Sequence, residues 1–330
     1  MNKKGFTKCC GMVFVGMVSM AFVSCGDDDD SGSYDVSTVV IETEDGDQLL
    51  VIGVGNLRYD YDSDGVLNYF YDGYEYDVTN NGTTFTHTYD MFDGAATIQL
   101  TLNGNGYITK SVMEDNVGDE DFSETYKETC NMSYDGSGHL TKVSASYSYA
   151  YIDDEEKENY SGSGSWTLTW SDGLLTKFVI SESESDYKCT ETYEYDYGND
   201  TYPNTYCQYA PAVWCESDAV LAELSYIGMI GVGPTYLPST VEYTETEEED
   251  GDIYSDEGSN SYKFYFDSDG TIYYQTDAKG SSKYYFYYDD YTGTSSRSFN
   301  VITEDEENID TFTESASHFR LFGKRHRNCR

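Results

Sequence analysis

Short turns built on Asp-Gly recur along most of this chain, each between two segments in which aromatic or β-branched residues alternate with polar ones. The clearest copy is Leu57–Leu67 (LRYDYDSDGVL), where Tyr59 and Tyr61 precede a Ser-Asp-Gly turn that ends at Gly65. Such a turn between alternating segments is the strongest short-range indication of a β-hairpin. Because each hairpin joins neighbouring strands, a series of them restricts the chain to an antiparallel meander.

Degenerate copies of one hairpin unit, aromatic-Asp-Ser-Asp-Gly-x-apolar, return around Gly136, Gly173 and Gly270. The chain also contains 35 tyrosines, and tyrosine favours strands because its ring covers sheet surface while its hydroxyl stays hydrated. We therefore predict a mainly β fold for residues 37–293: an antiparallel β-meander of hairpins. The meander forms either a soluble barrel or a strongly curved sheet.

One segment interrupts this alternation and predicts a short helix over residues 218–228. Val220, Leu221, Leu224 and Ile227 fall on one face at three- and four-residue spacing. Ser or Asp residues precede the segment as N-caps, and several glycines follow it. We expect this helix to cover or plug one end of the sheet.

Residues 1–24 predict a lipoprotein signal peptide, with lysines first and then an apolar run that is too short to span a bilayer. The stretch that ends Val23-Ser24-Cys25 resembles a bacterial lipobox. We therefore predict cleavage before Cys25 and acylation of its thiol, which would anchor the chain to the outer membrane through lipid. Residues 25–36 would then be an acidic tether.

The tether contains four consecutive acids: Asp27, Asp28, Asp29 and Asp30. A run of like charges repels itself and suits an extended spacer. The same run resembles the surface-export signal of Bacteroidetes lipoproteins, and we favour this second interpretation. It predicts an outer-membrane lipoprotein at the cell surface.

Charge restricts the partners of the chain. The net charge is −42, from 61 acidic and 19 basic residues. A surface of this sign repels nucleic acid and anionic lipid headgroups. We expect no nucleic-acid partner, and we exclude residues 294–330 from the fold as an irregular, disordered tail whose end is basic.

The tryptophans are the candidate ligand-stacking residues. Trp166 and Trp170 lie four residues apart, so both side chains face one side of a strand, and Trp214 lies in the irregular segment. Together with tyrosines they could stack on sugar rings. The competing interpretation is that these aromatic rings form the core of the sheet, and the usual burial of tryptophan favours it.

We predict no metal site and no cofactor. Asp60–Gly65 matches the opening of a calcium loop, but Tyr71 occupies the position where such a loop needs a bidentate glutamate, and a β-turn explains the acids. The cysteines after Cys25 are odd in number and form no Cys-x-x-Cys pair. Cys207 and Cys215 are either a local disulfide or two separate thiols.

Several features together resemble the DUF4595 lipoproteins of gut Bacteroidetes. They are the lipobox with its acidic run, the YDSDG-type hairpins and the segment YIGMIGVGPTYLPST at Tyr226–Thr240. The resemblance covers roughly Ser37 to Tyr291 and implies a porin-like β fold, no known activity and no catalytic residues. It does not imply that the strands span a membrane, since they alternate Tyr or Thr with charged residues and the mean hydropathy is −0.61.

No nucleophile elbow, P-loop or dinucleotide fingerprint occurs in the sequence, so we expect no enzyme. The expected function is that of a non-catalytic binding module for a glycan or an envelope protein. The alternative is a structural or assembly component of the cell envelope without a small ligand.

Overall fold

The structure is a computed structural model and describes residues 41–42, 48–62, 65–89, 93–119, 122–153, 157–185, 187–198, 202–213, 223–249 and 251–290. The predicted signal peptide, tether and C-terminal tail lie outside these residues. No helix within the described ranges is long and apolar enough to cross a membrane.

The described part of the chain is nearly all antiparallel β, as predicted. The strands are β1 (Ile41–Glu42), β2 (Gln48–Val54), β3 (Leu57–Tyr61), β4 (Leu67–Tyr71), β5 (Glu75–Thr79), β6 (Thr84–Thr88), β7 (Asp93–Leu102), β8 (Ile108–Gly118), β9 (Phe122–Tyr134), β10 (Leu140–Asp153), β11 (Lys157–Ser171), β12 (Leu174–Ser183), β13 (Tyr187–Asp196), β14 (Tyr202–Pro203), β15 (Tyr236–Leu237), β16 (Thr240–Glu249), β17 (Asp252–Phe266), β18 (Ile272–Asp277) and β19 (Lys283–Asp290).

Of the two arrangements predicted for the meander, the structure has the closed barrel. Among the described residues, 16 strands follow one another around it, from β2 to β13 and then from β16 to β19. The ring closes where β19 pairs antiparallel with β2, with Phe286 opposite Val54. Closure matters physically because it leaves no open sheet edge in the ring.

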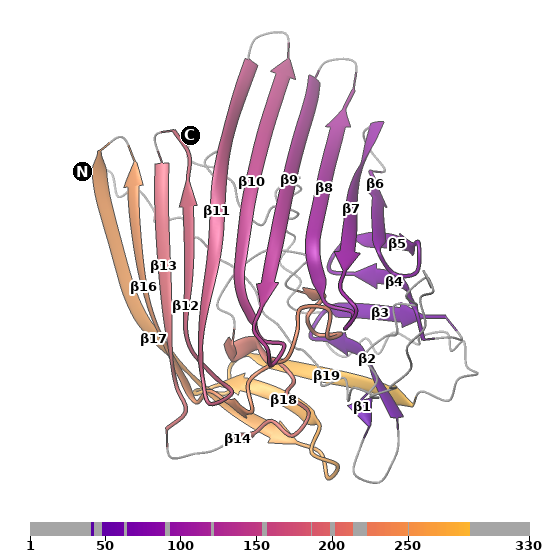
Figure 1. Cartoon of the computed structure of the whole chain (residues 1–330), viewed down its shortest axis with the longest axis vertical. Helices are drawn as coiled ribbons and strands as arrows, with labels where there is room; N and C mark the ends of the chain where they lie inside the picture. The colour runs from indigo at the N-terminus through magenta and orange to yellow at the C-terminus, as the bar shows by residue number, and fades with distance from the viewer. Residues whose placement is uncertain are drawn as a thin grey trace.

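The barrel is much taller on one side than on the other (Figure 1). Strands β9 to β11 are 13, 14 and 15 residues long, and β17 has 15. Strands β3 to β6 have only five residues each. The longer strands, β7 to β13 with β16 and β17, are here named the tall wall, and β3 to β6 are named the short wall. The tall wall rises beyond the short wall.

The predicted hairpin unit is confirmed as a recurring turn. The loops that begin at Asp62, Asn103, Asp135 and Asp267 each contain a glycine three residues later whose N–H donates to the first residue's carbonyl at 3.0–3.1 Å. Those four glycines have φ between 76° and 87°, a conformation that L side chains rarely adopt. The Asp172-Gly173 copy differs, because it is a two-residue turn with positive φ at both positions.

Strand alternation separates a polar outer face from a buried inner face. Ser and Thr side chains occupy most outward positions of the tall wall. One cross-strand row reads Asn131, Ser144, Ser165, Ser181, Thr190, Thr246 and Ser255. The inward positions carry the core, in which the largest fully buried side chains are Trp166, Tyr59, Tyr76, Tyr126, Tyr209, Tyr226, Phe70, Phe85 and Phe178.

The connection between β13 and β16 fills one end of the barrel. Its described residues, 204–213 and 223–235, are here named the plug. Strands β14 and β15 pair with each other at its base, and Pro211–Val213 forms a 3-10 turn. The plug bonds to several walls: Met229 O accepts from Ile108 N, and Val232 N and Thr235 N donate to the carbonyls of Gly138 and Gly173.

The predicted helix needs correction. Residues 218–222 lie outside the described residues, and from Glu223 onward only that residue is helical while 224–230 are turns. Leu224 and Ile227 are buried as expected, but on a turning backbone. Gly228 and Gly231 have φ of 77° and 90°, and the N–H of Met229 bonds to Leu224 O, so the helical pattern cannot continue. The described residues of this segment nevertheless hydrogen-bond to loops at one end of the barrel, those of Gly138 and Gly173.

Candidate functional site

The inner face of the tall wall pairs tyrosine hydroxyls with carboxylates. Such pairs come from strands and loops between β6 and β16. The hydrogen bonds are Tyr89 to Asp115 at 2.7 Å, Tyr126 to Glu128 at 2.7 Å, Tyr147 to Glu182 at 2.6 Å and Tyr187 to Glu247 at 3.0 Å. Each phenol donates and each carboxylate accepts, so these hydrogen bonds stabilise acids on the inner face.

Burial and the nearby acids keep these phenols protonated. Desolvation, followed by the charge of Glu182, raises the pKa of Tyr147 well above its ordinary value. Desolvation and Asp115 act in the same direction on the pKa of Tyr89. Both hydroxyls therefore remain hydrogen-bond donors at physiological pH.

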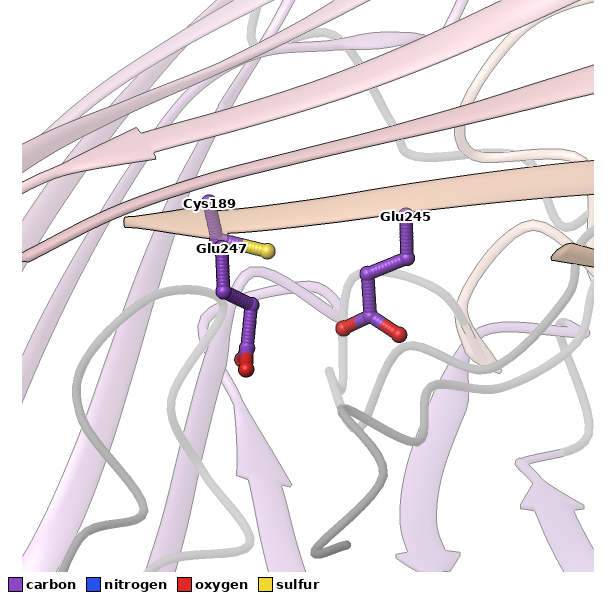
Figure 2. A group of neighbouring side chains, drawn as sticks. All are labelled: Cys189, Glu245 and Glu247. Atoms are coloured by element: carbon purple, nitrogen blue, oxygen red, sulfur yellow. The ribbon is translucent and has the colours of Figure 1, made fainter. Parts of the chain in front are cut away.

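Cys189, Glu245 and Glu247 meet on this inner face, on the adjacent strands β13 and β16. Cys189 is the cross-strand partner of Glu247. One ligand atom from each of the three side chains lies within 4.8 Å of the others. Figure 2 shows the thiol and both carboxylates on the same side of the strands. This donor set could bind a metal ion.

A pair of acids, Glu223 and Asp72, joins the plug to the short wall. Glu223 is fully buried, and its carboxyl group hydrogen-bonds the side chain of Asp72 in the β4–β5 turn. Desolvation, with a further contribution from Asp72, raises the pKa of Glu223 well above its usual value. The stability of the plug should therefore depend on the protonation of this carboxyl group.

The outer face of β17 to β19 carries a cluster of exposed and half-buried tyrosines, here named the tyrosine platform: Tyr265, Tyr273, Tyr274, Tyr285 and Tyr287. Tyr265, Tyr274 and Tyr285 are successive cross-strand partners. The rings of Tyr265 and Tyr274 stack with centroids 4.2 Å apart and planes at 12°, and Tyr285 lies 5.3 Å beyond Tyr274.

The platform is solvent-exposed. Tyr265, Tyr273 and Tyr287 are 41%, 47% and 39% exposed. The neighbouring Phe286 points the other way, toward the plug residue Tyr226, which places Tyr285 and Tyr287 on the outside of the barrel. Exposed apolar patches of this kind commonly mark interaction surfaces.

Two cations border the platform. Lys283 Nζ lies 5.6 Å from the centre of the Tyr274 ring, and the guanidinium of Arg58 lies 5.2 Å from the centre of the Tyr287 ring. Arg58 also donates to the carbonyl oxygens of Gly55 and Leu57. Cation–π contacts of this type restrict the rings, so the platform is preorganised.

Two of the tryptophans predicted as stacking residues, Trp166 and Trp170, pack in or against the core. Trp166 is 1% exposed and packs edge-on against Phe178. Trp170 stacks on His139 at 4.3 Å, and its Nε1 donates to Leu140 O. Trp214 lies outside the described residues. The prediction that Trp166 and Trp170 share one face is correct, but that face is the core.

Of the acids in Asp60–Gly65, Asp62 stabilises the turn. Asp62 Oδ1 accepts from Val66 N at 2.9 Å, and Gly65 N donates to Asp62 O. The β-turn interpretation accounts for these contacts without a cation. Cys207 is a free thiol, and Cys215, its potential disulfide partner, lies outside the described residues together with Cys25 and Asp27 to Asp30.

No protein-family model and no curated protein matches the chain. Two solved structures are similar to it. A porin-like protein from Bacteroides vulgatus is 16% identical, with a TM-score of 0.45 over 72% of this chain and 98% of that chain. A porin-like protein from Bacteroides uniformis is 13% identical, with a TM-score of 0.31 over 73% and 97%. At these values the likeness carries no information about function, and the DUF4595 resemblance stays a prediction.

Sequence reasoning missed both the platform and the Cys189 group. Lys283–Asp290 reads KYYFYYDD, in which consecutive aromatics hide which tyrosines face outward. Glu245 and Glu247 do show the two-residue spacing of one strand face. The two glutamates lie beside Cys189 because β13 pairs with β16. These strands are separated in the sequence by the plug, so local sequence does not reveal their pairing.

Proposed function

We propose that this chain is a cell-surface lipoprotein of the outer membrane whose barrel is a non-catalytic binding module for glycans. The ligand surface is the tyrosine platform. The observation that carries the proposal is the ladder of Tyr265, Tyr274 and Tyr285 on the outer face of the barrel, in which Tyr265 is exposed and the other two are half-buried.

The chemistry of the platform favours a glycan. A tyrosine presents an apolar ring beside a polar hydroxyl, and a sugar ring likewise has C–H faces bordered by hydroxyl groups. Several rings on adjacent strands can therefore pack against successive sugars while their hydroxyls form hydrogen bonds. Because Arg58 and Lys283 restrict the rings, little conformational entropy is lost on binding.

The outer hydroxyl rows support a domain that stands in water on a lipid tether. Serine, threonine, lysine and asparagine occupy the outward positions in the centre of β9 to β11, whereas a strand that faces lipid carries an apolar band there. Acylated Cys25 would supply the anchor, with the run from Asp27 to Asp30 as the surface-sorting signal.

Binding is tested by affinity electrophoresis of the purified protein through gels that contain host or plant polysaccharides. We expect the wild type to be retarded by at least one polysaccharide and the double variant Tyr265→Ala/Tyr274→Ala to migrate as in a gel without polysaccharide. Tyr236→Ala is the matched control, since Tyr236 is also 41% exposed but lies on β15. Equal retardation of the wild type and the double variant would refute the platform as the site.

A structural role in the envelope is the alternative, favoured by the packing of plug residues such as Tyr209 and Ile230 into the barrel. It predicts no retardation on any polysaccharide. A protein ligand is a further outcome: the wild type would then capture an envelope protein that the double variant does not capture.

Location is tested separately by the variant Cys25→Ala. We expect the wild type to fractionate with membranes and to be digested when intact cells are treated with protease. The variant should lose its membrane association. A wild-type protein that resists the protease until the outer membrane is permeabilised would contradict surface exposure.

A further inference from the structure

We propose that Cys189, Glu245 and Glu247 bind a divalent transition-metal cation inside the barrel, with zinc the best chemical match. This site is separate from the tyrosine platform, which lies on the outer face, and the inference does not depend on the glycan proposal.

The first argument is the convergence of three ligand atoms. Cys189 and Glu247 are cross-strand partners, and Glu245 lies two residues from Glu247 on the same face of β16. The thiol sulfur and one oxygen of each carboxylate lie within 4.8 Å of one another. With Zn–S near 2.3 Å and Zn–O near 2.1 Å, a tetrahedral site needs an S···O separation of about 3.6 Å. Rotation of the side chains that moves the ligand atoms by roughly 1 Å brings the separations from 4.8 Å or less to this value.

The second argument is the state of the thiol itself. Cys189 is only 4% exposed and forms no disulfide. Its sulfur makes no hydrogen bond within the described residues, although it points toward two carboxylates (Figure 2). Cys130 shows the contrast: it is equally buried on the inner face, and its thiol donates to Glu128 at 3.2 Å. An unpaired buried thiol beside two acids is explained by a cation between them.

The charge around the group favours a cation. Glu182 lies opposite Cys189 on β12, and Glu191 lies opposite Glu245, so both add carboxylates to the same face. The cation of Lys188 forms its ion pair with Glu248, and both residues lie on the opposite face of the strands. The hydroxyl of Tyr187 donates a hydrogen bond to Glu247 at 3.0 Å, and this bond would orient the carboxylate toward the metal.

The donor types select the metal. Calcium and magnesium prefer oxygen ligands only, whereas thiolate sulfur favours softer cations. Zinc accepts mixed sulfur and carboxylate ligands and is most often four-coordinate. Three protein ligands leave one position for water or for a further carboxylate. The thiol must lose its proton on binding.

The test uses cobalt as a spectroscopic substitute for zinc. Adding Co²⁺ to the full-length protein should produce thiolate-to-cobalt charge-transfer absorption at one equivalent, which Zn²⁺ then abolishes. Zn²⁺ should also raise the melting temperature. We expect Cys189→Ser to lack the absorption, and Glu245→Gln and Glu247→Gln to bind Co²⁺ at least tenfold more weakly.

Matched controls keep the test decisive. Cys130→Ser and Glu248→Gln should bind Co²⁺ as the wild type does. The glutamate variants preserve the thiol, so they report on the site even if Cys189→Ser does not fold. The proposal is overturned if the wild type gives no charge-transfer absorption, if Cys189→Ser retains it, or if Ca²⁺ raises the melting temperature as much as Zn²⁺ at the same concentration.

Discussion

The hydroxyl of Tyr59 on β3 donates a 2.6 Å hydrogen bond to the main-chain carbonyl of Glu223, at the start of the second half of the plug. Both residues are buried. The side chain of Glu223 meets Asp72 close by. Glu223 thus attaches the plug to the short wall through its main-chain carbonyl, and its side chain is a buried acid.

Stability should depend on the protonation of Glu223. Because burial and Asp72 raise its pKa, the folded protein binds this proton more tightly than the unfolded chain does. The stability that this proton contributes is therefore complete below the ordinary carboxyl pKa of 4.5 and is lost as the pH rises toward the folded pKa, by up to about 1.4 kcal/mol per pH unit. Glu223→Gln removes this dependence.

We expect the stability of Glu223→Gln relative to the wild type to increase as the pH rises from 5 to 8, measured by urea unfolding at each pH. Glu248→Gln is the control, since Glu248 is exposed on the outer face. Its difference from the wild type should be constant with pH. Parallel pH curves for the wild type and Glu223→Gln would contradict the buried proton.

Gly231 should not tolerate a side chain. Its φ is 90°, and a Cβ would lie 2.3 Å from Gly138 O and 2.9 Å from the Tyr134 ring. We expect Gly231→Ala to cost at least about 2 kcal/mol, from backbone strain and the clash together. Gly136→Ala is the control in the nearby turn, where a Cβ meets nothing within 4 Å. Thermal unfolding should separate the two variants, and equal melting temperatures would exclude close contact of the plug with this turn.

Trp166 should behave as a core residue. Because it is fully buried against Phe178, Trp166→Ala is expected to destabilise the barrel by about 3–5 kcal/mol. Thr167→Ala, at an exposed position of the same strand, should change stability by less than about 0.5 kcal/mol. Chemical denaturation measures both effects. A small effect of Trp166→Ala would contradict burial and favour the prediction that Trp166 stacks on a ligand at the surface.

Asn204 should stabilise the plug through its amide. Its Nδ2 donates to the carbonyls of Gln208 and Pro234, and its Oδ1 accepts from Gln208 N at 2.8 Å. Asn204→Ala leaves these buried groups unpaired, at about 1–3 kcal/mol for each. We expect a loss of at least about 3 kcal/mol and faster hydrogen exchange at Gln208 N, but no such change in Asn131→Ala on the outer face. Unchanged exchange at Gln208 would show that the amide is not essential.

Local features of the fold were predictable from sequence. The loop from Asp135 to His139 specifies its own geometry, because an aspartate accepts from main-chain N–H groups of the loop and a glycine takes the positive φ. Alternation likewise placed Trp166 and Trp170 on one face. The helix over 218–228 was mispredicted beyond Glu223, because apolar spacing alone does not distinguish a helix from buried turns that contain glycine.

The candidate sites were less predictable because they join distant segments. Tyr265 and Tyr285 approach each other through Tyr274, which requires two hairpins in register. Cys189 meets Glu247 only because the chain, after building the plug, returns beside β13 as β16.

The sequence by itself determined the class of this protein: hairpin turns and alternating strands are local properties that dictate an antiparallel meander. The tertiary structure decided that the meander closes, with Phe286 opposite Val54. It also decided which tyrosines face water and which acids surround a thiol. Those outcomes depend on strand register and on the volume that the plug occupies, and both follow from packing across the whole barrel.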